Sequence, residues 1–103
     1  RAIETAKIVA GVLGYPESSI KIVDSLYHAS PEKLLEIVKG INDKYNAIML
    51  VGHNPGLTEF ADDLIESDID NIPTCGIVGV AFDIERWQAL SADKAELLFY
   101  DYP

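Results

Sequence analysis

The chain has 103 residues, which is enough for one domain and too short for two. Its 17 acidic and 8 basic residues give a net charge of −9, and a surface of that sign repels a phosphate backbone, so nucleic acid is not expected as a partner. A single cysteine, Cys75, excludes an internal disulfide. Because no apolar run approaches the ~20 residues that span a bilayer, we expect a cytoplasmic protein with no membrane partner.

The first predicted element is a helix over residues 2–13. Apolar residues recur there at helical spacing, and Gly14 and Pro16 end the pattern. Arg1 stands where a cap or a preceding strand would be expected, so we interpret the chain as a segment of a longer polypeptide. In residues 19–24, β-branched apolar side chains alternate with polar ones, and this pattern predicts a short strand.

A second helix is predicted from Ser30 and Pro31, which are typical of the N-cap and the first helical position. Its apolar face ends near Gly40. Residues 47–51 form an apolar run without alternation, as expected for a strand that is covered on both faces. A third helix should follow over residues 57–65.

The last third of the chain contains two predicted strands, at residues 76–83 and 95–100. A turn or short helix at residues 85–90 joins them, and so short a link favours an antiparallel pair. The predicted fold class is therefore α/β, with three layers (αβα), a mostly parallel sheet and an antiparallel edge.

The segment Gly52-His53-Asn54-Pro55-Gly56 is the strongest candidate for a binding site. It combines a histidine, flexible glycine backbone and the free amides of a helix start, and together these suit an anion. The alternative interpretation is that glycine and Asn-Pro form the turn, while His53 is solvated or bonded to backbone.

Residues 51–57, Val-Gly-His-Asn-Pro-Gly-Leu, resemble the second histidine motif of the histidine phosphatase superfamily, most closely that of the small SixA-type phosphohistidine phosphatases. Residues 1–6, Arg-Ala-Ile-Glu-Thr-Ala, resemble the R-A-x-x-T-A helix start of that family. Residues 73–76, Pro-Thr-Cys-Gly, resemble its P-T-x-x turn, and residues 26–31 fit the small-phosphatase branch. The resemblance spans nearly the whole chain.

This resemblance implies a phosphoglycerate-mutase-like fold in which Arg1 and His53 are catalytic. Arg1 would hold a phosphoryl group with two hydrogen bonds, and His53 would bond to the phosphoryl oxygens and stabilise their charge. Asn54 and Thr74 are the further substrate-binding candidates, and each has an alternative role in a turn or cap. The family needs no metal and no cofactor.

The sequence departs from the family at its start, because no Arg-His-Gly motif with the nucleophilic histidine is present. His28 lacks the neighbouring arginine and glycine and is interpreted as a solvated loop residue before Ser30. We therefore expect residues 1–103 to be one histidine-phosphatase-like domain without its N-terminal strand. Such a fragment should be inactive alone, and should associate through open strand edges or need the missing segment to fold well.

The expected substrate is a phosphorylated protein that carries phosphohistidine. Between Val23 and His53 there is no room for the long insertion that supplies a proton-donating carboxylic acid in larger family members, and Asp24 is a weak substitute. A phosphoryl group on nitrogen depends less on such an acid than a phosphate ester does. The alternatives are a phosphatase of small phosphate esters and a non-catalytic module that binds an anion or a protein.

Overall fold

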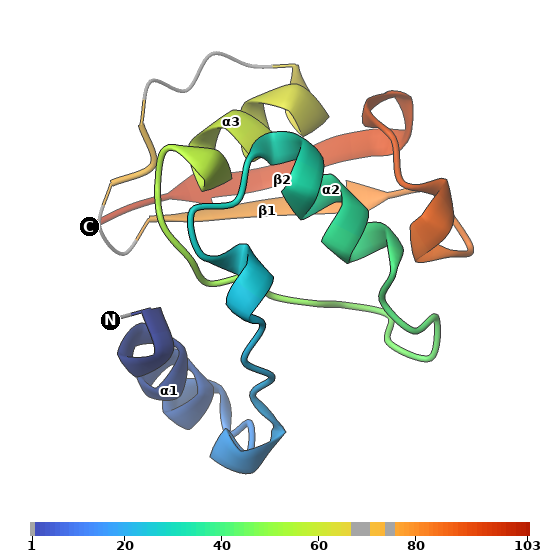
Figure 1. The fold of residues 1–103 in the computed structure, drawn as a ribbon. Helices are drawn as coiled ribbons and strands as arrows, with labels where there is room; N and C mark the ends of the chain where they lie inside the picture. Colours follow the sequence, from blue (N-terminus) through green and yellow to red (C-terminus); the bar gives the residue numbers. More distant parts are fainter. Residues whose placement is uncertain (1, 67–70, 74–75) are drawn as a thin grey trace.

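The computed structural model describes residues 2–66, 71–73 and 76–103. The described residues form α-helices, short 3₁₀ turns and a pair of strands (Figure 1). In chain order the elements are α1 (Ala2–Leu13), η1 (Glu17–Ser19), η2 (Asp24–Leu26), α2 (Pro31–Lys39), α3 (Gly56–Ile65), β1 (Ile77–Phe82), η3 (Trp87–Ala89), η4 (Ala92–Lys94) and β2 (Ala95–Asp101).

The predicted three-layer αβα fold with a mostly parallel sheet is wrong for this structure. Within the described ranges there are three α-helices and one sheet, whose two strands, β1 and β2, are antiparallel. The antiparallel pairing of these two strands was expected from the short link between them. Their expected place at the edge of a parallel sheet is what the structure contradicts.

The two other predicted strands lack the partner that a strand requires. Residues 20–23 and 47–51 belong to no strand, since neither segment joins a ladder. An apolar run signals burial, but its backbone becomes a strand only when a neighbour takes up its N–H and C=O groups. Residues 47–51 are also not covered on both faces, because Met49 is 55% exposed.

The three helices follow the local signals in the sequence. Gly14 ends α1 with a φ of 73°, a left-handed conformation that glycine adopts without strain. Ser30 caps α2, because its Oγ accepts a hydrogen bond of 3.2 Å from the Lys33 N–H, and Pro31 takes the first helical position. α3 begins at Gly56, one residue before the predicted start.

The hairpin of β1 and β2 contains a register shift beside a glycine. Gly79 faces Phe99, and the register shifts between Gly79 and Val80, so that Val80 faces Leu97. A Cβ at position 79 would collide with the Phe99 ring. Glycine therefore lets an aromatic side chain lie across the neighbouring strand.

The core lies where α2, α3 and the link between the strands meet. α2 packs on α3, and α3 packs on β2 (Figure 1). The buried cluster consists of Leu34, Val38, Phe60, Leu64 and Leu90. Trp87 anchors the link to the segment after α2: its indole N–H donates to the Tyr45 carbonyl at 2.9 Å, and its backbone N–H donates to Asp43 Oδ1 at 2.8 Å.

α1 stands to one side of this core (Figure 1). It packs chiefly on the turn η1, where Lys7 Nζ and Glu17 Oε1 are 3.5 Å apart. Much of its apolar surface is open, and Val12 is 84% exposed. In the part of the chain that the structure describes, no helix has the length and apolar character that a membrane crossing requires.

Candidate functional site

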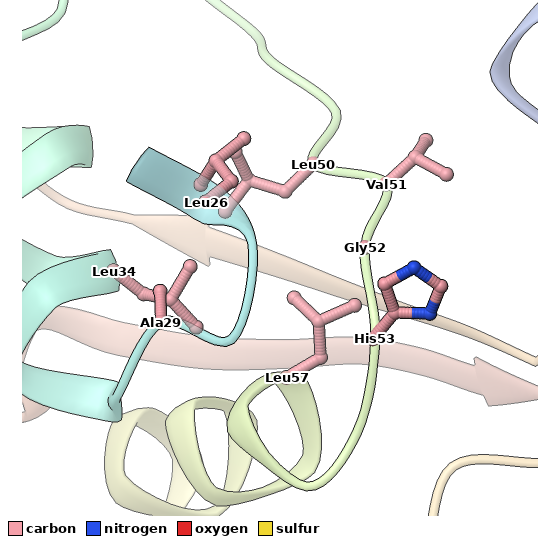
Figure 2. Close-up of a pocket in the computed structure, with 8 residues that line it drawn as sticks. All are labelled: Leu26, Ala29, Leu34, Leu50, Val51, Gly52, His53 and Leu57. Carbon is pink, nitrogen blue, oxygen red and sulfur yellow. The ribbon is translucent and has the colours of Figure 1, made fainter. Parts of the chain in front are cut away.

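The segment Gly52-His53-Asn54-Pro55-Gly56 carries an extended run of chain into the start of α3. Figure 2 shows this run, from Leu50 to His53, passing the first turn of α3 beside Leu57. The peptide bond between Asn54 and Pro55 is cis. His53 and Asn54 are exposed, whereas Gly56 is buried at the first position of the helix.

Asn54 holds this turn in place through both ends of its side chain. Its Oδ1 accepts hydrogen bonds from the Thr58 N–H at 3.2 Å and the Thr58 hydroxyl at 2.7 Å. Its Nδ2 donates to Asn71 Oδ1 at 3.0 Å and to the Ile72 carbonyl at 2.8 Å. The Thr58 hydroxyl also accepts from the Ile72 N–H at 3.0 Å. Asn54 therefore bonds to the first turn of α3 and joins it to residues 71–72, which is the turn role considered from the sequence.

Gly56 brings a second loop against the turn. A Cβ at this position would collide with the Ala29 carbonyl oxygen and would lie 3.7 Å from Leu34 Cδ1. Only glycine permits this approach of backbone to backbone. As a result, the loop of residues 27–30 and the histidine turn lie next to each other, although they are far apart in the sequence.

A small apolar gap lies under the extended run. Leu26, Ala29, Leu34, Leu50, Leu57 and their neighbours surround it, with Gly52 and His53 at its margin (Figure 2). Its volume of about 10 Å³ is at the lower limit for one water molecule. The gap is a packing feature of the core and is too small for a ligand.

A larger, open pocket lies on the other side of the turn. Its volume is about 180 Å³, and its lining residues are His28, Ala29, Ser30, Pro31, His53, Asn54, Pro55, Gly56 and Glu59. Both histidines of the chain therefore border one pocket. The Tyr27 ring lies near both of them: its centroid is 4.0 Å from that of the His28 ring and 6.1 Å, edge to face, from that of the His53 ring.

The structure places two of the four residues predicted for the site. His53 and Asn54 line the open pocket. Arg1 and Thr74 lie outside the described residues, as does Cys75. Among residues 2–66, 71–73 and 76–103, no three histidine, cysteine, aspartate or glutamate side chains gather closely enough to hold a metal ion.

Sequence reasoning missed the position of His28. It was interpreted as a solvated loop residue, and its side chain is exposed, but it borders the same pocket as His53. The one available signal was Gly56, because a glycine at a helix start can indicate a close approach of backbone. That signal does not identify which segment approaches.

Comparison with known proteins gives one relative and no family. The chain is 29% identical, over 96 aligned residues, to the uncharacterized protein ML1117 of Mycobacterium leprae (strain TN). The alignment covers 84% of this chain and 59% of that protein, so the chain spans about three fifths of its relative's length. No protein-family profile matches the chain, and no solved structure matches it.

Proposed function

We propose that the chain is part of a phosphohistidine phosphatase of the histidine phosphatase superfamily, acting in the cytoplasm on a phosphorylated protein. The observation that carries the proposal is the position of His53 on the wall of an open pocket beside the start of α3. An imidazole N–H beside a helix start offers hydrogen bonds to a phosphoryl oxyanion.

The proposed reaction passes through a phosphohistidine on the enzyme. In the full-length protein of this proposal, a nucleophilic histidine attacks phosphorus and forms a P–N bond, while the P–N bond of the substrate breaks and its leaving imidazole takes up a proton from water. Water then attacks the phosphorus of the intermediate, which releases inorganic phosphate and regenerates the histidine. His53 and Arg1 stabilise the charge on the phosphoryl oxygens during both steps, and no metal or cofactor takes part.

The choice of phosphohistidine over phosphate esters rests on the leaving group. The interval between Val23 and His53 is filled by η2, α2 and the extended run, and it contains no long insertion with a carboxylic acid. An alcohol is a poorer leaving group than a protonated imidazole and depends more on such an acid. A phosphatase of small phosphate esters is the alternative within the same class.

The second candidate is a non-catalytic module that binds an anion or a protein at the same pocket. The observation that favours it is the absence of an Arg-His-Gly motif from the 103 residues. The sequence that precedes Arg1 in the gene separates the two candidates. A strand that ends in Arg-His-Gly supports the enzyme, and its absence supports the binding module.

The enzymatic proposal is tested by turnover of the full-length protein with a phosphohistidine-containing protein and with small phosphate esters. His53→Ala should lower turnover on phosphohistidine by about 100-fold or more, the scale of losing one charge-stabilising donor in a preorganised site. The exposure of His53 means that the folded state should survive this change, which circular dichroism verifies. Turnover of esters alone, or wild-type turnover by the variant, contradicts the proposal.

A further inference from the structure

His28 is the side chain in the pocket that the proposed function leaves without a role. It borders the same 180 Å³ pocket as His53. The Tyr27 ring centroid is 4.0 Å from that of His28 and 6.1 Å from that of His53. The two imidazole centroids are therefore at most 10.1 Å apart. Two imidazoles within this distance of each other can both reach one small group, since each N–H···O bond spans ~2.9 Å.

The size of the pocket indicates what kind of group fits. Pockets for whole small molecules have volumes of ~300–1,000 Å³. At about 180 Å³, this pocket accommodates one functional group, such as a phosphoryl group, with the rest of its carrier outside. A group carried on the surface of another protein fits this size.

The backbone of His28 adopts a left-handed conformation. Its φ is 55°, in the left-handed region that glycine adopts most easily. Histidine at such a position carries some strain, and strained residues gather at binding and catalytic sites. The His28 side chain is exposed and its ring packs against Tyr27, so the conformation directs an imidazole to the rim of the pocket rather than into the core.

We propose that His28 is a second oxyanion-binding residue, which donates an N–H hydrogen bond to the phosphoryl group that His53 also contacts. Tyr27 positions both imidazoles through its ring. Glu59 borders the same pocket and opposes a bound anion. A second N–H donor at the same pocket offsets part of that repulsion, on a chain whose net charge is −9. The inference rests on the proposed function for the identity of the ligand.

The test is the binding of inorganic phosphate to the full-length protein, measured by isothermal titration calorimetry at constant ionic strength. His28→Gly should raise the Kd for phosphate about tenfold, the effect of losing one hydrogen bond to a charged group. Its free energy of unfolding should not fall, because glycine adopts a φ of 55° without strain. His28→Asn is the second variant, since asparagine tolerates the same backbone and lacks the imidazole.

The controls separate this inference from the proposed function. Ser18→Ala, on the exposed turn η1, should bind phosphate as the wild type does. If His53→Ala weakens phosphate binding and both His28 variants bind normally, the role of His28 is refuted and the proposed function stands. If the His28 variants lose phosphate affinity while the wild type hydrolyses no phosphohistidine, the anion pocket is supported and the proposed function fails. A wild-type protein that binds no phosphate refutes the inference.

Discussion

Replacing Gly56 by alanine should separate the two walls of the pocket. A Cβ at this position would overlap the Ala29 carbonyl oxygen, and its next neighbours are Ala29 C at 3.5 Å and Leu34 Cδ1 at 3.7 Å. Because the obstacle is backbone, relief requires a shift of the 27–30 loop or of the start of α3 by roughly 1 Å, toward the ordinary C···O separation of ~3.3–3.6 Å. Overpacking of this kind costs about 1–3 kcal/mol.

The assay compares the urea denaturation of Gly56→Ala with that of the control variant Gly40→Ala. Gly40 has a φ of −86°, and a Cβ there would meet only Ile37 O at 3.5 Å and Glu36 O at 3.7 Å, which are ordinary contacts. We expect the free energy of unfolding to fall by about 2 kcal/mol for Gly56→Ala and to change by less than about 0.5 kcal/mol for Gly40→Ala. Equal stability of the two variants would refute the close approach of Gly56 to Ala29, and with it the reason why His28 and His53 share a pocket.

Two further predictions concern side-chain hydrogen bonds. Asn54→Ala should lower the free energy of unfolding by about 2 kcal/mol, since it removes four hydrogen bonds, two of them to the buried Thr58. Asn42→Ala loses one exposed bond to the Lys44 N–H and should cost about 0.5 kcal/mol, so similar urea midpoints for both variants would contradict the role of Asn54. The hydrogen bond from the Ser91 hydroxyl holds the pKa of Asp93 below its ordinary value, so Ser91→Ala should raise that pKa in an NMR titration. Because the pKa of Asp93 is lower in the folded state, its hydrogen bond with Ser91 stabilises the fold at neutral pH, and this stabilisation is lost as the pH falls below about 4. An Asp93 titration that Ser91→Ala leaves unchanged would contradict the role of Ser91.

The parts of the fold that depend on neighbouring residues could be predicted from the sequence. Ser30 and Pro31 mark the start of α2, and Gly14 marks the end of α1, because capping and backbone preference act over a few residues. The hairpin was also predictable, since the link between its strands is short. In each of these cases, the residues that interact lie close together in the sequence.

The sheet could not be predicted in the same way, because a strand depends on a partner that may lie anywhere in the chain. Residues 47–51 have the composition of a buried strand, yet they are extended without a ladder and Met49 is exposed. The candidate site likewise has a part set by local sequence and a part set by distant contacts. The histidine turn was found from its local pattern, whereas the meeting of His28 with His53 depends on contact between Ala29 and Gly56.

The position of Asn54 before Pro55 affects the deamidation of its side chain. Asparagine side chains deamidate when the backbone nitrogen of the next residue attacks the amide carbon, and that attack requires an N–H, which proline lacks. The Asn54 amide, whose two ends bind Thr58 and residues 71–72, is therefore protected from slow conversion to aspartate by this route. Conversion would replace the donating Nδ2 by an oxygen facing the Ile72 carbonyl, so the proline preserves the join between α3 and the segment that leads to β1 for the lifetime of the protein.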